Sequence, residues 1–77
     1  MSSKKFVKRF ALCLDNSGYL ASLECRKIYR VLPDEDAAAD GDLRVVDESG
    51  EDYLYPADRF AFVALPLAVE RVLLRAS

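Results

Sequence analysis

Two clusters of carboxylates are the residues of this sequence whose types and spacing come closest to those of a catalytic or metal site. The first cluster comprises Asp34, Glu35, Asp36, Asp40 and Asp42, and the second comprises Asp47, Glu48, Glu51 and Asp52. Paired carboxylates can exchange protons or bind calcium, but a calcium loop needs acids at alternating positions, a central glycine and a closing glutamate. Asp34, Asp36 and Gly41 fail that spacing. Because both clusters fall at an expected helix start and at turns, we predict that these acids form a solvated surface.

Nucleophilic catalysis and metal binding are restricted because the sequence contains no histidine. Cys13 and Cys25 form no C-x-x-C pair, and a zinc site would need carboxylates as its other ligands. We expect both cysteines to be buried or half-buried free thiols, although their spacing alone leaves a disulfide open. No glycine-rich phosphate loop occurs in the sequence. We therefore predict a protein that is not an enzyme and has no catalytic residue, no metal and no cofactor.

The composition indicates one folded domain with an uneven charge. The chain has 77 residues and is 52% hydrophobic, which is too high for a disordered protein. Basic residues gather before the first acid, Asp15, and these are Lys4, Lys5, Lys8 and Arg9. Residues 10–77 hold the other seven of the 11 basic residues and all 13 acidic residues, a net charge of −6. We expect residues 1–9 to form a flexible basic N-terminal arm and residues 10–77 to form a single domain.

No membrane segment is expected. No part of the sequence approaches the roughly 20 apolar residues of a membrane-spanning helix. A basic start followed by apolar residues has the order of a secretory signal, but the apolar run from Phe10 ends at Asp15 and is too short. We therefore expect a cytoplasmic protein with no membrane partner.

The region from Val45 to Phe60 carries the clearest structural signal. Asp47 can accept backbone hydrogen bonds from the turn that it opens, and Gly50 supplies a left-handed residue before the next strand. Pro56 cannot donate to a sheet ladder and therefore belongs at a strand end, and residues 57–59 are long enough for one helical turn. We predict a hairpin with positive φ at Gly50, a proline-marked corner, and a further strand.

Local patterns predict the remaining strands and connections. We expect strands at residues 10–14, 27–32, 42–47, 52–55 and 60–64. Residues 15–18 are typical of a turn, and residues 19–25 are expected to form a loop that packs a leucine or two under the sheet. A short helix is expected within residues 33–41, with Asp34 as its N-cap.

A C-terminal helix is expected to begin near Pro66. Its apolar face has helical spacing and comprises Leu65, Val69, Val72, Leu73 and Ala76. Glu70 and Arg71 are expected to point away from this face. We predict that Val69 and Leu73 are buried, against the sheet or against a second copy of the chain.

The corner at residues 55–60 resembles the end of a Src-homology-3 domain, where a strand meets a proline, makes one tight helical turn and re-enters the sheet. Pro56 matches that proline, Phe60 matches the apolar residue at re-entry, and residues 23–32 resemble the segment that leads into the second strand of that family. The chain is also similar to a group of short uncharacterised bacterial and phage proteins with the pattern Y-x-V-L … R-V-x-D-x-S-G-E-D-Y-L-Y-P-x-x-R-F. The resemblance covers roughly residues 10–64. It implies a mainly β fold, a small five-stranded Src-homology-3-like barrel with a short inserted helix and a C-terminal helix, and implies nothing about activity.

The departures from the peptide-binding family concern its ligand groove. That family uses a tyrosine-rich motif in its first strand, a tryptophan, and a tyrosine three residues after the proline. This sequence has residues 12–15 (Leu-Cys-Leu-Asp) in the first place, no tryptophan, and Arg59 in the last. We therefore expect that the aromatic groove for polyproline helices is absent.

We expect non-catalytic binding to an unidentified protein partner, with Tyr53, Tyr55 and Arg59 as candidate contacts. Tyr53 and Tyr55 share a strand face and Leu54 lies on the other; the resemblance places Tyr55 inside and leaves Tyr53 open between core and surface. The alternative is a nucleic-acid accessory protein whose contacts are Lys4, Lys5, Lys8 and Arg9. The arm has a suitable composition, but the acidic body would repel a phosphate backbone. A third hypothesis is a homodimer formed through the C-terminal helix.

Overall fold

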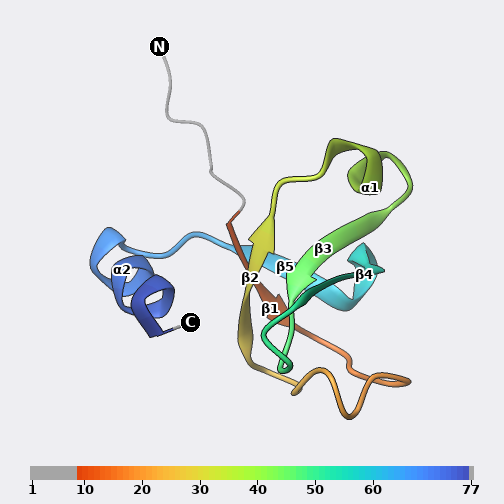
Figure 1. The fold of residues 1–77 in the computed structure, drawn as a ribbon, viewed down its shortest axis with the longest axis horizontal. Coiled ribbons are helices and arrows are strands. Elements are labelled where there is room, and N and C mark those ends of the chain that lie inside the picture. The colour runs from red at the N-terminus through yellow and green to blue at the C-terminus, as the bar shows by residue number, and fades with distance from the viewer. Residues whose placement is uncertain (1–8, 77) are drawn as a thin grey trace.

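The computed structural model describes residues 9–76, which form one antiparallel sheet and two α-helices. The elements follow in the order β1 (Phe10–Cys13), β2 (Ile28–Leu32), α1 (Glu35–Ala39), β3 (Asp42–Val46), β4 (Asp52–Pro56), the 3-10 helix η1 (Ala57–Arg59), β5 (Phe60–Val63) and α2 (Leu67–Ala76). The sheet has the strand order β4-β3-β2-β1-β5 (Figure 1). This confirms the predicted five strands, the short inserted helix and the C-terminal helix. Within residues 9–76, no strand pairing joins β4 to β5 to close the sheet into a barrel.

One face of the sheet and the β1–β2 loop enclose the hydrophobic core. Side chains alternate across a strand, and the strand residues that face the core are Ala11, Cys13, Tyr29, Val31, Leu43, Val45, Tyr55 and Phe60. Leu23 joins them from the loop and is fully buried, whereas Leu20 is exposed. The prediction that the loop packs a leucine under the sheet is confirmed for Leu23.

The β1–β2 loop returns to the sheet through a β-bulge opposite Cys13. The Cys13 N–H donates to the Lys27 carbonyl at 2.8 Å, and the Arg26 N–H donates to the Cys13 carbonyl at 2.8 Å. Two residues of one strand therefore face one residue of the other. Arg26 has a φ of 69°, in the left-handed region that glycine adopts more readily than any other residue.

Helix α1 agrees with the predicted short helix and its cap. The Asp34 carboxylate accepts the Ala37 N–H at 2.9 Å, which satisfies one of the free donors of the first turn. Ala37 is buried, and Gly41 follows the C-cap residue with a φ of 80°. The Gly41 carbonyl accepts the Ala57 N–H at 2.9 Å, so the end of α1 is tied to η1.

Helix α2 presents a different face to the sheet from the one predicted. Val69 is 42% exposed, and Leu67 and Val72 are exposed as well. Glu70, which was expected to point away, has a side chain only 15% exposed and lies 3.8 Å from Arg9. The prediction that Val69 is buried against the sheet is therefore wrong, and Leu73 is half-buried. The physical reason is that α2 lies to one side of the sheet and does not cover its open face (Figure 1), so its valines stay in contact with solvent.

No helix within residues 9–76 has both the length and the apolar content needed to cross a bilayer.

Candidate functional site

Two turns of identical pattern, Asp-x-Ser-Gly, lie at the base of the sheet. In the turn at residues 15–18, Asp15 Oδ1 accepts the Ser17 N–H at 2.9 Å and the Ser17 hydroxyl at 2.7 Å. In the turn at residues 47–50, Asp47 Oδ1 accepts the Ser49 N–H at 2.9 Å and the Ser49 hydroxyl at 2.6 Å. The glycines that close the two turns have φ values of 86° and 85°. The predicted positive φ at Gly50 is confirmed.

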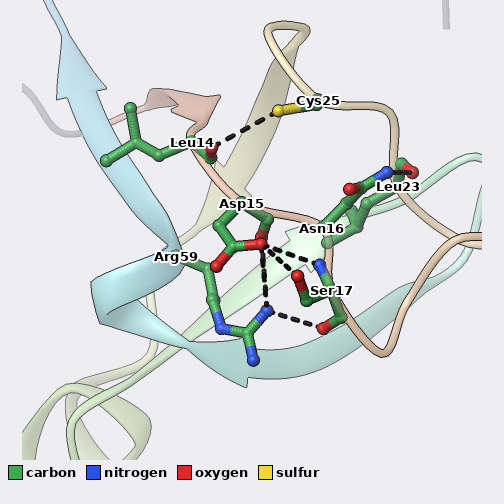
Figure 2. Close-up of polar contacts among 7 residues, drawn as sticks. All are labelled: Leu14, Asp15, Asn16, Ser17, Leu23, Cys25 and Arg59. Atoms are coloured by element: carbon green, nitrogen blue, oxygen red, sulfur yellow. Dashed lines mark hydrogen bonds and ion pairs between the residues drawn. The ribbon is translucent and has the colours of Figure 1, made fainter.

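Arg59 links η1 to the first of these turns, as Figure 2 shows. Its Nη1 donates to the Ser17 carbonyl at 2.6 Å and lies 3.7 Å from Asp15 Oδ1. The backbone contributes as well, because the Leu14 N–H donates to the Arg59 carbonyl at 2.8 Å. The hydrogen bonds from Ser17, and then the charge of Arg59, hold the pKa of Asp15 below its ordinary value. The guanidinium of Arg59 is therefore already engaged within the molecule.

The second turn is joined to the core by Tyr55. Its hydroxyl donates to Asp47 Oδ2, and its ring packs edge-on against Tyr19 with the centroids 5.0 Å apart. Asp47 is only 7% exposed, so the prediction that this acid belongs to a solvated surface is wrong. Burial raises the pKa of Asp47, but the hydrogen bonds from Ser49 and Tyr55 outweigh it, and the net pKa lies below the ordinary value.

Glu48 forms a second polar link between the hairpin and the rest of the sheet. Its carboxylate accepts hydrogen bonds from the Tyr29 hydroxyl and from Lys27 Nζ. Its N–H donates to the Ser22 carbonyl at 3.0 Å, which brings the β1–β2 loop into the same contact. Hydrogen bonds from Lys27 and Tyr29 lower the pKa of Glu48, while burial and then the bond to Glu48 raise the pKa of Tyr29. Glu48 therefore connects the β3–β4 hairpin, the β1–β2 loop and β2. The prediction that this acid belongs to a solvated surface did not include such a role.

Arg44 binds one aspartate from each acidic cluster. Arg44 Nε lies 2.8 Å from Asp34, and Arg44 Nη1 lies 2.9 Å from Asp52. Asp34 therefore caps α1 and binds Arg44 at once, which holds its pKa below the ordinary value. Within residues 9–76, no group of three or more acidic, histidine or cysteine side chains is arranged to hold a metal ion.

The candidate contact residues do not form one surface. Tyr55 lies in the core, and Arg59 lies over the Tyr19 ring at 5.4 Å from its centroid. Tyr53 is 51% exposed, and its hydroxyl donates to Glu51 Oε1 at 2.9 Å. The structure thus places Tyr53 at the surface and brings Tyr19, which the sequence did not single out, together with Tyr55 and Arg59. A tyrosine directly after an Asp-x-Ser-Gly turn was the available signal.

A hollow of about 420 Å³ lies beside the exposed part of β4. Its lining residues are Tyr19, Ser22, Asp47, Ser49, Tyr53, Leu54 and Tyr55. We call it the tyrosine hollow.

A larger pocket, of about 650 Å³, lies on the α1 side of the sheet, and we call it the α1 pocket. Its apolar lining comes from distant parts of the chain and includes Val31, Leu43, Phe62 and Leu74. Arg30 contributes an exposed cation and Ala38 of α1 an exposed methyl group. The sequence did not predict this pocket, and its one local signal was the charged Arg30 within the apolar run of β2.

The basic arm is represented in the structure by one residue. Lys4, Lys5 and Lys8 lie outside the described residues. That residue is Arg9. Its carbonyl accepts the Val31 N–H at 2.7 Å, and the exposed Arg9 side chain lines the α1 pocket.

Both cysteines are free thiols. Cys13 is buried, and burial raises its pKa. Cys25 is exposed, contrary to expectation, and its Sγ donates to the Leu14 carbonyl at 3.3 Å (Figure 2). The physical reason is that Cys25 lies in the β1–β2 loop, outside both strands, and its side chain does not join the core.

Comparisons with protein-family models, with curated proteins and with solved structures find no match. The chain is a small, mainly β protein built on a five-stranded antiparallel sheet.

Proposed function

We propose that the chain is a non-catalytic binding module that holds a segment of another protein in the α1 pocket. The observation that carries this proposal is the pocket itself, whose volume of about 650 Å³ lies within the range of known binding sites. Val31 and Leu43 reach it from the core, so an apolar side chain placed there would extend the core. A bound apolar anchor is the usual source of affinity at protein interfaces.

The charges around the α1 pocket support a peptide as its occupant. Ion pairs with Asp34 and Asp52 hold the Arg44 side chain in place at one wall of the α1 pocket. Arg30 has no ion pair among residues 9–76, and Glu35 and Asp42 line the pocket as well. A partner segment with one apolar anchor and polar flanks of both signs matches this arrangement better than a small apolar ligand does.

We also propose that the sheet belongs to the Src-homology-3-like barrels, as the sequence resemblance implies. The strand order and the passage from Pro56 through η1 to Phe60 support this class. The alternative function, nucleic-acid binding through Lys4, Lys5, Lys8 and Arg9, stays a prediction. The ionic contact of Arg9 with Glu70 at 3.8 Å engages part of that arm.

The experiment uses two neighbouring alanines of α1 as a matched pair. Both are exposed, but Ala38 lines the α1 pocket and Ala39 does not. Tagged wild-type protein, Ala38→Trp and Ala39→Trp are used to capture partners from the native cell, after circular dichroism shows that all three fold. We expect Ala38→Trp to lose a protein partner that Ala39→Trp retains. Equal capture by both variants, or recovery of nucleic acid in place of protein, would contradict the proposal.

A further inference from the structure

Strand β4 ends the sheet on one side, because β3 is its only paired neighbour within residues 9–76. Its side chains include two large exposed ones on opposite faces. Tyr53 is 51% exposed and Leu54 is 47% exposed. An exposed edge strand with apolar side chains is the kind of surface to which another strand adds.

The hydrogen bonds at the two ends of the β3–β4 ladder show which backbone groups of β4 face outward. At one end the Asp47 N–H donates to the Glu51 carbonyl at 3.0 Å, and at the other end the Ala57 N–H donates to the Gly41 carbonyl at 2.9 Å. Antiparallel partners alternate between hydrogen-bonded and non-hydrogen-bonded pairs. Counting in steps of two from either end of the ladder therefore selects the same residues of β4 as members of hydrogen-bonded pairs.

The alternation assigns the ladder bonds of β4 to Tyr53 and Tyr55, which lie opposite Val45 and Leu43. Asp52 and Leu54 then direct both their N–H and their C=O away from β3. Pro56 directs only a C=O outward, since it has no N–H. The open edge of β4 thus offers two donors and three acceptors to an added strand.

The tyrosine hollow lies beside this edge. Tyr53 and Tyr55, which share a face of β4, line it, and Leu54 lines it as well. Because side chains alternate along a strand, every second side chain of an added strand would face the hollow. Tyrosine rings line the hollow and carboxylates surround it, with Asp47 in the lining and Glu51 bonded to the Tyr53 hydroxyl. No basic residue among the described ones lines it. A cationic side chain matches both features, through cation–π contact with the exposed Tyr53 ring and through charge complementarity. The Tyr19 ring already carries Arg59.

We propose that the β4 edge binds an extended segment of a partner protein, which adds antiparallel to β4 as a sixth strand and places a basic side chain in the tyrosine hollow. This surface is separate from the α1 pocket, so the two proposals stand or fall independently. Strand addition derives its affinity from the backbone and its specificity from alternate side chains. The specificity here comes from Tyr53 and Glu51.

The test uses a fluorescent peptide of alternating lysine and valine, titrated with the full chain by fluorescence anisotropy. Lysines opposite Tyr53 would fill the hollow, and valines opposite Asp52 and Leu54 would direct their amides toward β4. N-methylation of the valine amides should therefore abolish binding, whereas N-methylation of the lysine amides should not. Equal affinities of the two methylated peptides, or the reverse order, would overturn the arrangement. So would equal binding of a glutamate–valine peptide, or no saturable binding up to about 1 mM, a level that corresponds to about −4 kcal/mol.

Two variants of the protein complete the test. Leu54→Pro removes an N–H that the β3–β4 ladder does not use. The loss of one hydrogen bond should weaken binding of the lysine–valine peptide by up to about tenfold. Glu51→Gln keeps the backbone and should weaken the lysine peptide by about twofold to fivefold. Asp36→Asn, on exposed α1, is the charge-matched control and should change nothing. Unchanged binding by Glu51→Gln would overturn the role of the hollow. A wild-type dimer seen by light scattering and lost in Leu54→Pro would assign the edge to a second copy and overturn the proposed partner.

Discussion

The two Asp-x-Ser-Gly turns have the same local geometry but different surroundings. In both, an aspartate binds the serine two residues later through its N–H and its hydroxyl, and a glycine with φ near 85° closes the turn. The side chain of Asp15 is 56% exposed, and its partner outside the turn is Arg59. Asp47 is buried, and its partner is the core hydroxyl of Tyr55. Four residues are thus enough to specify the turn, whereas the fold determines how much each turn contributes to stability.

The largest expected effect is on Asp47. Asp47→Ala removes the acceptor of the buried Tyr55 hydroxyl as well as the bonds to Ser49, and should lower the free energy of unfolding by about 2–4 kcal/mol. Asp15→Ala loses the equivalent local bonds but only a solvent-screened ion pair, and should lower the free energy of unfolding clearly less than Asp47→Ala does. Urea denaturation followed by circular dichroism measures both.

A double variant shows whether the hydroxyl is the reason for that difference. Asp47→Ala combined with Tyr55→Phe removes the buried hydroxyl together with its acceptor, so part of the lost stability should return relative to Asp47→Ala alone. Equal losses for the two aspartates, or strictly additive losses in the double variant, would show that burial does not separate the turns.

Substitution of the two turn glycines, unlike substitution of the two aspartates, should lower the stability by similar amounts. At both Gly18 and Gly50 an added Cβ would meet no atom within 4 Å, so a substitution there costs only backbone strain. Gly18→Val and Gly50→Val should each lower the free energy of unfolding by about 1–3 kcal/mol. Thermal unfolding of the pair measures this. A neutral Gly50→Val, or a large inequality between the two, would show that the turns are not equivalent in their backbones.

Acid should weaken the contribution of both turn aspartates, because the pKa of each lies below its ordinary value. The pKa of Asp47 lies below its ordinary value, so this carboxylate stabilises the fold above the unfolded-state pKa of about 4. That stabilisation is lost as pH falls through the lower folded-state pKa. Asp47→Asn should therefore flatten the loss of stability as the pH falls below about 4. Asp15→Asn should act in the same direction, because the pKa of Asp15 is lowered as well. If Asp47→Asn had the same acid profile as the unsubstituted protein, this carboxylate would not stabilise the fold.

The sequence predicted what depends on neighbours along the chain. The turn glycine at Gly50, the cap at Asp34, and the strands all follow from short patterns. It did not predict the burial of Asp47, because that requires Tyr55 to lie beneath the hairpin. It placed Glu70 on the wrong side of α2, because Arg9 lies about 60 residues earlier in the chain. The α1 pocket was missed for the same reason, since β2, β3, β5 and α2 meet there.

The smallest expected effect concerns Arg26, a residue with positive φ that is not a glycine. Arg26 occupies the bulge opposite Cys13 with a φ of 69°, and within residues 9–76 it is the only such residue that is not glycine. A side chain in this region costs about 1–2 kcal/mol, whereas glycine loses more backbone entropy on folding, about 0.5–1 kcal/mol. Arg26→Gly should therefore raise the free energy of unfolding by about 0.5–1 kcal/mol, which urea denaturation can resolve. Arg26→Val should lower it, because a β-branched residue tolerates this backbone least. If Arg26→Gly destabilised the protein instead, the Arg26 side chain would have to contribute more than its backbone costs, and the bulge would then be unlike both turns.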